Sequence, residues 1–157
     1  MGMTEPTLTV ASFESFVEHA EPRLRRAFVA KFGVEYGNDV TADVLAYAWE
    51  HWQSVADATN QVGYLYRVGQ SKARRYRRWA RRTTFPQESM GFETDVGPGL
   101  SQALSRLSDD QRVAVILVHS YGWTYADAAD ALCIPVSTLR NHLHRGMARL
   151  RTFLEGT

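Results

Sequence analysis

The chain has 157 residues, of which 45% are hydrophobic and 22% are charged, and its formal net charge is +1 at pH 7. These values are typical of a soluble globular protein with enough apolar side chains for a core. No stretch approaches the roughly 18 consecutive apolar residues of a membrane span, and residues 1–10 lack the basic and apolar pattern of a secretory signal. The single cysteine, Cys133, excludes an internal disulfide and any Cys-based metal site. We therefore expect a cytoplasmic protein without membrane insertion.

Apolar residues repeat at intervals of three and four from residue 12 to residue 32, which predicts a first amphipathic helix. Either Ser12 or Ser15 is a suitable cap for its start. Gly33 and Gly37 then predict a break in the chain.

A second helix is expected to begin at about Asp39, because aspartate is a favoured N-cap residue. The polar segment 53–60 predicts a loop, and the apolar pattern resumes in a third helix over 61–82. Pro and Gly are frequent in 83–99, where Glu88, Glu93 and Asp95 are the only charged residues, and this predicts a flexible acidic linker. A structureless stretch of this length is uncommon inside one compact domain, so we place a domain boundary there, between 12–82 and 100–157.

The C-terminal part returns to helical periodicity with a short helix over 100–107. Ser108 and Gln111 fit a capping box for the next helix, which continues to Gly122. Thr124 is a suitable cap for a short helix, and Pro135 separates that helix from a last one over 136–154. The sequence therefore predicts an all-α protein of two small helical domains joined by a flexible linker.

The third predicted helix carries an unusual charge pattern, with eight basic residues and no acidic one between Arg67 and Arg82. Tyr64, Tyr66, Tyr76 and Trp79 are interleaved with them. Cations for phosphates and aromatic rings for unstacked bases are what single-stranded nucleic acid requires. The alternative is a solvated helix face with tyrosines that pack in the core. We expect DNA contacts from Arg67, Gln70, Ser71, Lys72, Arg74, Arg75 and Arg78.

The short helix after Thr124 and the last helix have the spacing of a helix-turn-helix, whose second helix enters the major groove by its N-terminal residues. Leu139, Leu143, Met147 and Leu150 form one apolar stripe on that last helix. Such helix pairs also occur as plain packing units. The excess of four arginines over one acid beyond Thr138 favours DNA binding. The expected DNA contacts are Ser137, Thr138, Arg140, Asn141, His144 and Arg145.

No pattern indicates an enzyme, a cofactor or a metal. The five histidines are scattered, and the two nearest, His142 and His144, point roughly 200° apart on a helix. The acidic pair Asp109 and Asp110 fits the first turn of a helix, where carboxylates are stabilising. We expect no catalytic residues, no cofactor and no metal site.

Taken together, six blocks resemble the small, two-domain sigma factors of the extracytoplasmic-function type, which belong to the sigma-70 family of bacteria. They follow the family's order and linker length over most of residues 12–154. The blocks are NDVTADVLAYAW (38–49), GYLYRVGQSKA (63–73), ALSRLSDDQR (103–112), YGWTYADAA (121–129), IPVSTLR (134–140) and LHRGMARLR (143–151).

The resemblance implies a protein that binds core RNA polymerase, at its clamp and flap, and directs it to the −10 and −35 elements of promoter DNA. The helix around Asp39, Asp43 and Trp49 would dock on the clamp. The segment 53–60 and the basic helix would hold the melted −10 strand, the last helix would read the −35 duplex, and the acidic linker would pass through the RNA channel. An anti-sigma factor and a monomeric free state are also implied.

Three residues depart from the family's usual pattern. Ala42 stands in place of a frequent glutamine, Ser71 in place of asparagine and Cys133 in place of the glycine of the turn. Either a left-handed backbone at Cys133 costs about 1 kcal/mol, or the turn differs from the family's. The alternative function is a LuxR-like helix-turn-helix regulator that binds duplex operator DNA without polymerase, although this leaves the basic helix without a task.

Overall fold

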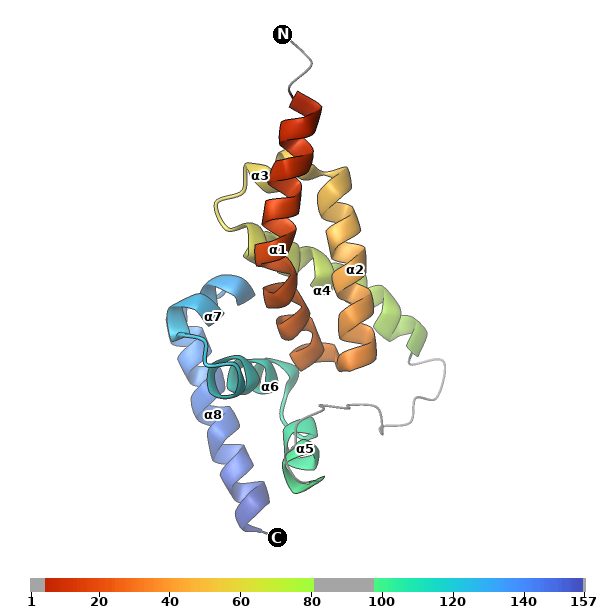
Figure 1. Cartoon of the computed structure of the whole chain (residues 1–157). Helices are drawn as coiled ribbons and strands as arrows, with labels where there is room; N and C mark the ends of the chain where they lie inside the picture. Colours follow the sequence, from red (N-terminus) through yellow and green to blue (C-terminus); the bar gives the residue numbers. More distant parts are fainter. Residues whose placement is uncertain (1–4, 81–97, 157) are drawn as a thin grey trace.

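The structure, a computed structural model, describes residues 5–80 and 98–156, with side chains for 10–74 and 99–156. Every regular element in this part of the chain is helical, which confirms the all-α prediction (Figure 1). The helices form an N-terminal unit, α1–α4, and a C-terminal unit, α5–α8. The elements are α1 (Glu5–Phe32), α2 (Val34–Glu50), α3 (Trp52–Ala56), α4 (Gln61–Ala80), α5 (Pro98–Ser105), α6 (Asp109–Val115), the π-helical turn η2 (Ile116–Ser120), α7 (Tyr125–Leu132) and α8 (Val136–Glu155).

Helices α1 and α2 lie side by side as an antiparallel pair (Figure 1). Gly33 alone makes the turn between them, with a φ of 89° that suits glycine. Our prediction that α2 begins at Asp39 was wrong, because Gly37 lies inside the helix and Asp39 is not a cap. Gly37 serves close packing: a Cβ atom there would lie 2.5 Å from the backbone of Val29 on α1. Of the two glycines that we expected to break the chain, Gly33 does so, whereas Gly37 lies inside α2 and lets it pack closely against α1.

The start of α1 also differs from the prediction. The helix begins at Glu5, so Ser12 and Ser15 are interior, exposed residues and neither caps it. Pro6 lies in the first turn, where its missing N–H group costs no hydrogen bond. Because α1 begins several residues before the first apolar repeat, we looked for its capping residue too late in the chain.

The segment 53–60 is only partly a loop, since the short helix α3 occupies Trp52–Ala56 before the chain turns into α4. Helix α4, which the apolar pattern predicted as a helix over 61–82, crosses the α1–α2 pair (Figure 1). Two contacts fix this crossing. The hydroxyl groups of Tyr47 and Tyr64 lie 3.1 Å apart, and Gly69 lets α4 approach the ring of Phe28.

The C-terminal unit forms as its capping residues predict. The side chain of Ser108 accepts from the N–H of Gln111, and the Gln111 side chain accepts from the N–H of Ser108, so the capping box is present. Helix α6 then widens into η2, where the N–H of Tyr121 donates to the carbonyl of Ile116 at 3.1 Å. The predicted single helix up to Gly122 is therefore an α-helix followed by a π-helical turn.

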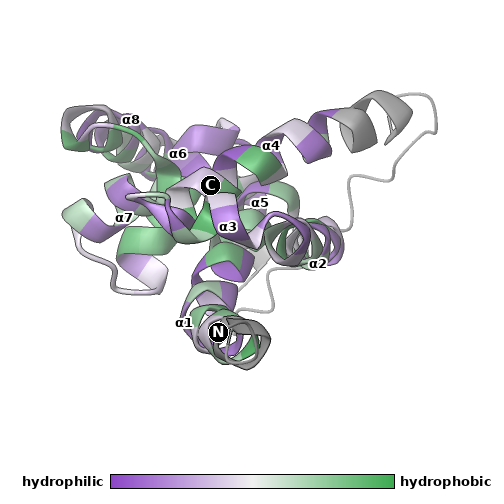
Figure 2. Cartoon of the chain, turned by 90° about the horizontal axis from the view of Figure 1, so that it is seen from above, coloured by the Kyte–Doolittle hydropathy of each residue, from purple (hydrophilic) through white to green (hydrophobic). Residues whose placement is uncertain are grey.

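Both units contribute to one hydrophobic cluster, which runs from Phe16 on α1 to Leu150 on α8. Figure 2 shows the hydrophobic segments gathered where the helices meet. The predicted linker lies outside the described residues up to residue 97, and its last two residues, Pro98 and Gly99, belong to α5. Among the described helices, none is long and apolar enough to cross a bilayer.

Candidate nucleic-acid interface

The turn between α7 and α8 has the hydrogen bonds of a Schellman motif. The N–H of Ile134 donates to the carbonyl of Ala129 at 3.0 Å, and the N–H of Cys133 donates to that of Asp130 at 3.1 Å. Cys133 adopts the left-handed conformation, with φ 57° and ψ 45°, which is one of the two outcomes that the sequence left open. At the other end of α7, the Thr124 side chain accepts from the N–H of Asp127 at 3.0 Å. These contacts fix α7 and α8 as a helix-turn-helix.

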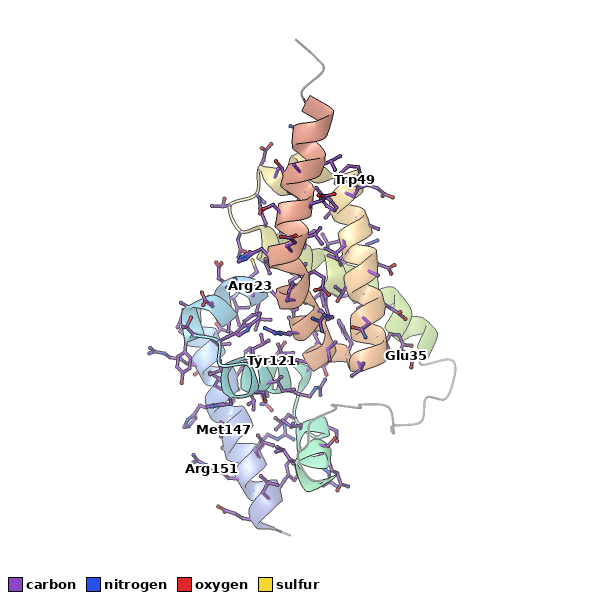
Figure 3. The ribbon with its side chains drawn as sticks, in the orientation of Figure 1. Arg23, Glu35, Trp49, Tyr121, Met147 and Arg151 are labelled. Atoms are coloured by element: carbon purple, nitrogen blue, oxygen red, sulfur yellow. The ribbon has the colours of Figure 1, made fainter. Side chains whose placement is uncertain are left out.

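Helix α8 divides into a buried and an exposed face. Leu139, Leu143 and Leu150 are buried, and Met147 is half-buried against them. Figure 3 shows Met147 and Arg151 at different points along this helix. Thr138 is half-buried, and the other predicted DNA contacts are exposed: Ser137, Arg140, Asn141, His144 and Arg145. The residues that offer hydrogen bonds to bases and phosphates are therefore available to a major groove.

Tyr125 is a member of this surface that the sequence analysis missed. Its ring is 42% exposed at the start of α7, and the guanidinium carbon of Arg140 lies 5.8 Å from the ring centre. A cation above a tyrosine face is attracted by the ring quadrupole. Tyr125, at the start of α7, therefore helps to orient Arg140 in the first turns of α8.

Helix α4 presents a second exposed polar face. Arg67, Ser71 and Arg74 are exposed, and their spacing of four and three residues places them on one side of the helix. Gln70 and Lys72 are half-buried, and the Lys72 ammonium lies 5.8 Å from the centre of the Tyr47 ring. The side chains of Arg75 and Arg78 lie outside the described residues.

Two of the four aromatic residues that we predicted for an open stacking surface on α4, Tyr64 and Tyr66, pack instead in or beside the core. Tyr66 is only 3% exposed, and its ring stacks on Phe28 with 5.2 Å between centres. Tyr64 is half-buried and bonded to Tyr47. Both therefore pack in or beside the core, as the alternative interpretation held, while the side chains of Tyr76 and Trp79 lie outside the described residues.

Comparison with known proteins agrees with this geometry. The family described as sigma-70, region 4, matches residues 99–150, the segment that contains the helix-turn-helix. The extracytoplasmic-function RNA polymerase sigma factor SigL of Mycobacterium tuberculosis, in strains H37Rv and CDC 1551, is 25% identical over 151 residues, with 88% of this chain and 85% of SigL covered. The chain is therefore similar to sigma factors of the extracytoplasmic-function type over most of its length. The solved structure of the sigma factor RpoE in complex with the anti-sigma factor NepR, from Bartonella quintana, has the same fold, with a TM-score of 0.64 and 21% identity over 92% of this chain and 97% of that one.

Helix α2 carries the residues that we predicted for polymerase docking. Asp39 is exposed and Asp43 half-buried on one side of the helix, but Trp49 lies roughly 80–120° around the axis from them. Trp49 is 48% exposed and contacts Phe13, with 4.9 Å between ring centres. Figure 3 shows Trp49 and Glu35 at opposite ends of α2. The structure thus brings the two acids together and places the tryptophan in a separate aromatic cluster.

The acidic character of the start of α2 affects its neighbours. The pKa of Tyr36 is raised by burial first, and then by the negative charges of Glu35 and Asp39. The same negative charges attract positively charged groups to the start of α2.

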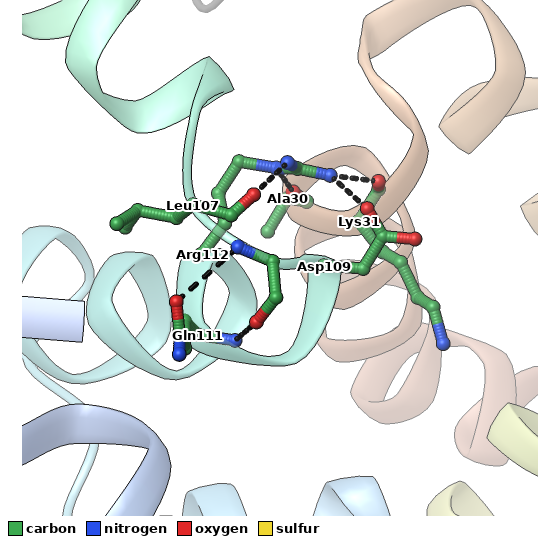
Figure 4. Close-up of polar contacts among 7 residues, drawn as sticks. Ala30, Lys31, Leu107, Asp109, Gln111 and Arg112 are labelled. Carbon is green, nitrogen blue, oxygen red and sulfur yellow. Dashed lines mark hydrogen bonds and ion pairs between the residues drawn. The ribbon is translucent and has the colours of Figure 1, made fainter. Parts of the chain in front are cut away.

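Two residues that matter for the architecture were missed in the sequence analysis. Arg112 is a charged residue with no sequence pattern that indicates burial, but its side chain is 1% exposed between the two units (Figure 4). Asn60 ends the segment predicted as a polar loop, but it caps α4 and contacts α7. The cap was available from the sequence, because asparagine is a favoured N-cap and Asn60 directly precedes the predicted helix. The contact with α7 and the burial of Arg112 depend on segments far apart in the chain. Within the described residues, no group of three or more His, Cys, Asp or Glu side chains forms a metal site.

Proposed function

We propose that this sigma factor binds core RNA polymerase through the acidic face of α2 and directs it to promoters, where α8 reads the −35 duplex and α4 holds the −10 strand. The observation that carries the proposal is the exposed polar face of α8, which lies opposite a buried leucine stripe within the segment that matches sigma-70 region 4. Exposed polar residues in the first turns of a recognition helix can reach base edges in the major groove.

The −10 function rests on the exposed row of Arg67, Ser71 and Arg74 and on the segment that precedes α4. Guanidinium groups at this spacing can follow successive phosphates, and Ser71 offers a hydroxyl between them. Because Tyr66 is buried, base stacking is not assigned to it. Gln70 and Lys72 complete the proposed site, and Arg75 and Arg78 extend it on sequence grounds.

The LuxR-like alternative explains only the helix-turn-helix. The matches to SigL and to the RpoE fold extend over most of the chain, including α1–α4, which a stand-alone helix-turn-helix regulator does not need. We also propose that the free protein is a monomer and that an anti-sigma factor is among its partners, as the RpoE–NepR complex illustrates for RpoE.

The test is transcription from sheared genomic DNA by bacterial core RNA polymerase, with and without the purified protein, followed by sequencing of the transcripts. We expect new, discrete start sites preceded by two shared motifs about one and a half helical turns apart. A tight complex with a palindromic duplex in the absence of core, together with no new starts, would instead establish the duplex-binding regulator.

A further inference from the structure

The ring of Tyr125 lies at the exposed end of the helix-turn-helix, between its two helices. Tyr125 is the first residue of α7, and the residues three, four and seven positions further on, Ala128, Ala129 and Leu132, are buried. Residues at this spacing share one side of a helix, so the tyrosine continues the buried side of α7 to the surface. It does so toward α8, because the guanidinium carbon of Arg140 lies 5.8 Å from the ring centre. Figure 1 shows α7 beside the beginning of α8.

The backbone around this ring is fixed at both ends of α7. At the start, the Thr124 side chain accepts from the N–H of Asp127 at 3.0 Å, which sets the first turn that carries Tyr125. At the end, the bonds from Cys133 and Ile134 close the turn into α8. The position of the ring relative to the first turns of α8 therefore follows from the motif itself.

Arg140 has a distinctive environment for an exposed arginine. In the part of the chain that the structure describes, its guanidinium group makes no hydrogen bond or ion pair and contacts only the ring. By contrast, Arg25 donates from Nε to a carboxylate oxygen of Glu21 at 2.8 Å. A carboxylate uses N–H donors and offsets the positive charge, whereas a ring face attracts the cation and leaves its in-plane donors available. Arg140 is thus held without being used.

Arg145 provides a comparison on the same helix. It is exposed five residues further along α8, and among the described residues it makes no hydrogen bond, ion pair or ring contact. A long side chain loses rotamer freedom when a ligand immobilises it, and this loss weakens binding. Arg140 has lost part of that freedom before any ligand arrives. The structure therefore pre-organises one of the two arginines and leaves the other free.

The chemistry of a held guanidinium group favours one kind of ligand. Two of its in-plane N–H groups can bind O6 and N7 of guanine in the major groove at the same time, which is the commonest specific contact of arginine with DNA. Both bonds form only when the guanidinium plane is correctly aligned, so orientation contributes to this contact. Attraction to the phosphate backbone acts from many orientations and carries no sequence information.

We propose that Tyr125 of α7 is a specificity-determining residue for the −35 element, because its ring holds the guanidinium group of Arg140 ready to read one guanine. Tyr125 acts through Arg140 and is a positioning residue. The inference rests on the proposed function, since it concerns how the same helix reads the −35 duplex. It places one determinant of base preference on α7, outside the helix that enters the groove.

The experiment selects duplexes from a randomised pool with the full-length protein, alone and with bacterial core RNA polymerase, and compares the base preference at each position. Tyr125→Leu replaces the ring by an apolar side chain that suits a helix, and Tyr125→Phe keeps the ring but removes the hydroxyl group. Each is also combined with Arg140→Ala and, as a matched control, with Arg145→Ala. In the free protein, NMR measures the upfield shift that the ring gives to the side-chain protons of Arg140.

We expect Tyr125→Leu to reduce the preference for guanine at one position by about two- to fivefold, which corresponds to the ~0.5–1 kcal/mol of an exposed cation–π contact. Preferences at other positions should stay unchanged, and Tyr125→Phe should lose less than about twofold. With Arg140→Ala, Tyr125→Leu should have no further effect at that position, whereas with Arg145→Ala the two effects should multiply. The upfield shift should be present in the wild type and in Tyr125→Phe but absent from Tyr125→Leu.

The outcomes separate this inference from the proposed function. A wild-type protein that selects no sequence, with or without polymerase, would remove both. A clear preference that Tyr125→Leu leaves unchanged, or a wild-type protein without the ring-induced shift of Arg140, would overturn the inference alone.

Two further results would reject the ring as the determinant. Equal losses in Tyr125→Leu and Tyr125→Phe would assign the effect to the hydroxyl group. A uniform weakening on all sequences would assign Arg140 to a phosphate contact. If circular dichroism shows that Tyr125→Leu disturbs the fold, Tyr125→Gln, which also lacks the ring, decides the test.

Discussion

Helices α4 and α8 are both 20 residues long and both carry arginines, but they use their aromatic and apolar residues differently. On α8, leucines face the core and polar side chains face solvent, so the helix has one structural and one recognition face. On α4, Tyr64 and Tyr66 look like base-stacking residues but pack on the N-terminal unit. The arginines therefore mark the exposed face of each helix, whereas the described tyrosines of α4 do not.

The largest expected effect tests the structural role of Tyr66. We expect Tyr66→Ala to lower the free energy of unfolding by about 3–5 kcal/mol, because the variant leaves a cavity beside Phe28. Urea denaturation followed by circular dichroism measures the change. Tyr125→Ala, at an exposed ring, is the matched control and should change stability by less than about 0.5 kcal/mol. Equal effects would mean that the two tyrosines are not distinguished by burial.

On α8, Arg140→Ala and Asn141→Ala should each reduce discrimination between the correct and altered −35 sequences by about 1–3 kcal/mol, because each removes a side chain that can form bidentate hydrogen bonds to a base edge. Competition binding of the polymerase complex to promoter variants measures the change. Arg106→Ala, in the turn after α5 and against Phe153, should leave discrimination unchanged. A uniform weakening on all sequences would reassign both residues to phosphate contacts.

On α4, replacement of Arg67 and Arg74 by glutamine should reduce the slope of log affinity against log salt concentration by about 0.7–0.9 for each phosphate that the protein no longer neutralises. Both residues lie on one exposed face, so their effects should add. Fork-DNA binding by the polymerase complex across a salt series measures the slope. Arg25→Gln is the control, and a slope unchanged by the double variant would contradict the proposed −10 site.

The smallest effect concerns the turn between α7 and α8. Cys133→Gly should stabilise the protein by about 0.5–1 kcal/mol, because glycine adopts the left-handed conformation without a Cβ clash and loses part of this gain to its freer unfolded chain. The thermal midpoint should rise by about 2 °C. Cys133→Ala retains the Cβ and should give no such rise; a lower midpoint for the glycine variant would show that the thiol contributes packing.

Local signals predicted much of this molecule. The capping box at Ser108 and the Thr124 cap depend on neighbours within a few residues, and each is present. The exposed face of α8 follows in the same way from the spacing of its leucines. The left-handed backbone of Cys133 was one of two outcomes that the sequence left open.

Features that depend on distant segments were missed or misplaced. Helix α2 begins earlier than predicted, and its residue Gly37 packs against α1. Tyr66 is buried because its ring stacks on Phe28 of α1. Arg112 contacts residues more than 80 positions away in the sequence. Composition and periodicity describe one helix at a time, so they predict which face is apolar but not which partner covers it.

The carbonyl of Asp130 has a consequence for how this protein can be observed. It accepts a hydrogen bond from the N–H of Cys133 inside the turn and another from the side-chain amide of Asn60, which precedes α4 in the N-terminal unit. Two donors that share one oxygen polarise it jointly, so removal of one changes the electronic environment of the other. The backbone amide of Cys133 is therefore a natural spectroscopic probe: its NMR chemical shift responds to contact between the units, although the residue itself belongs to the DNA-reading motif.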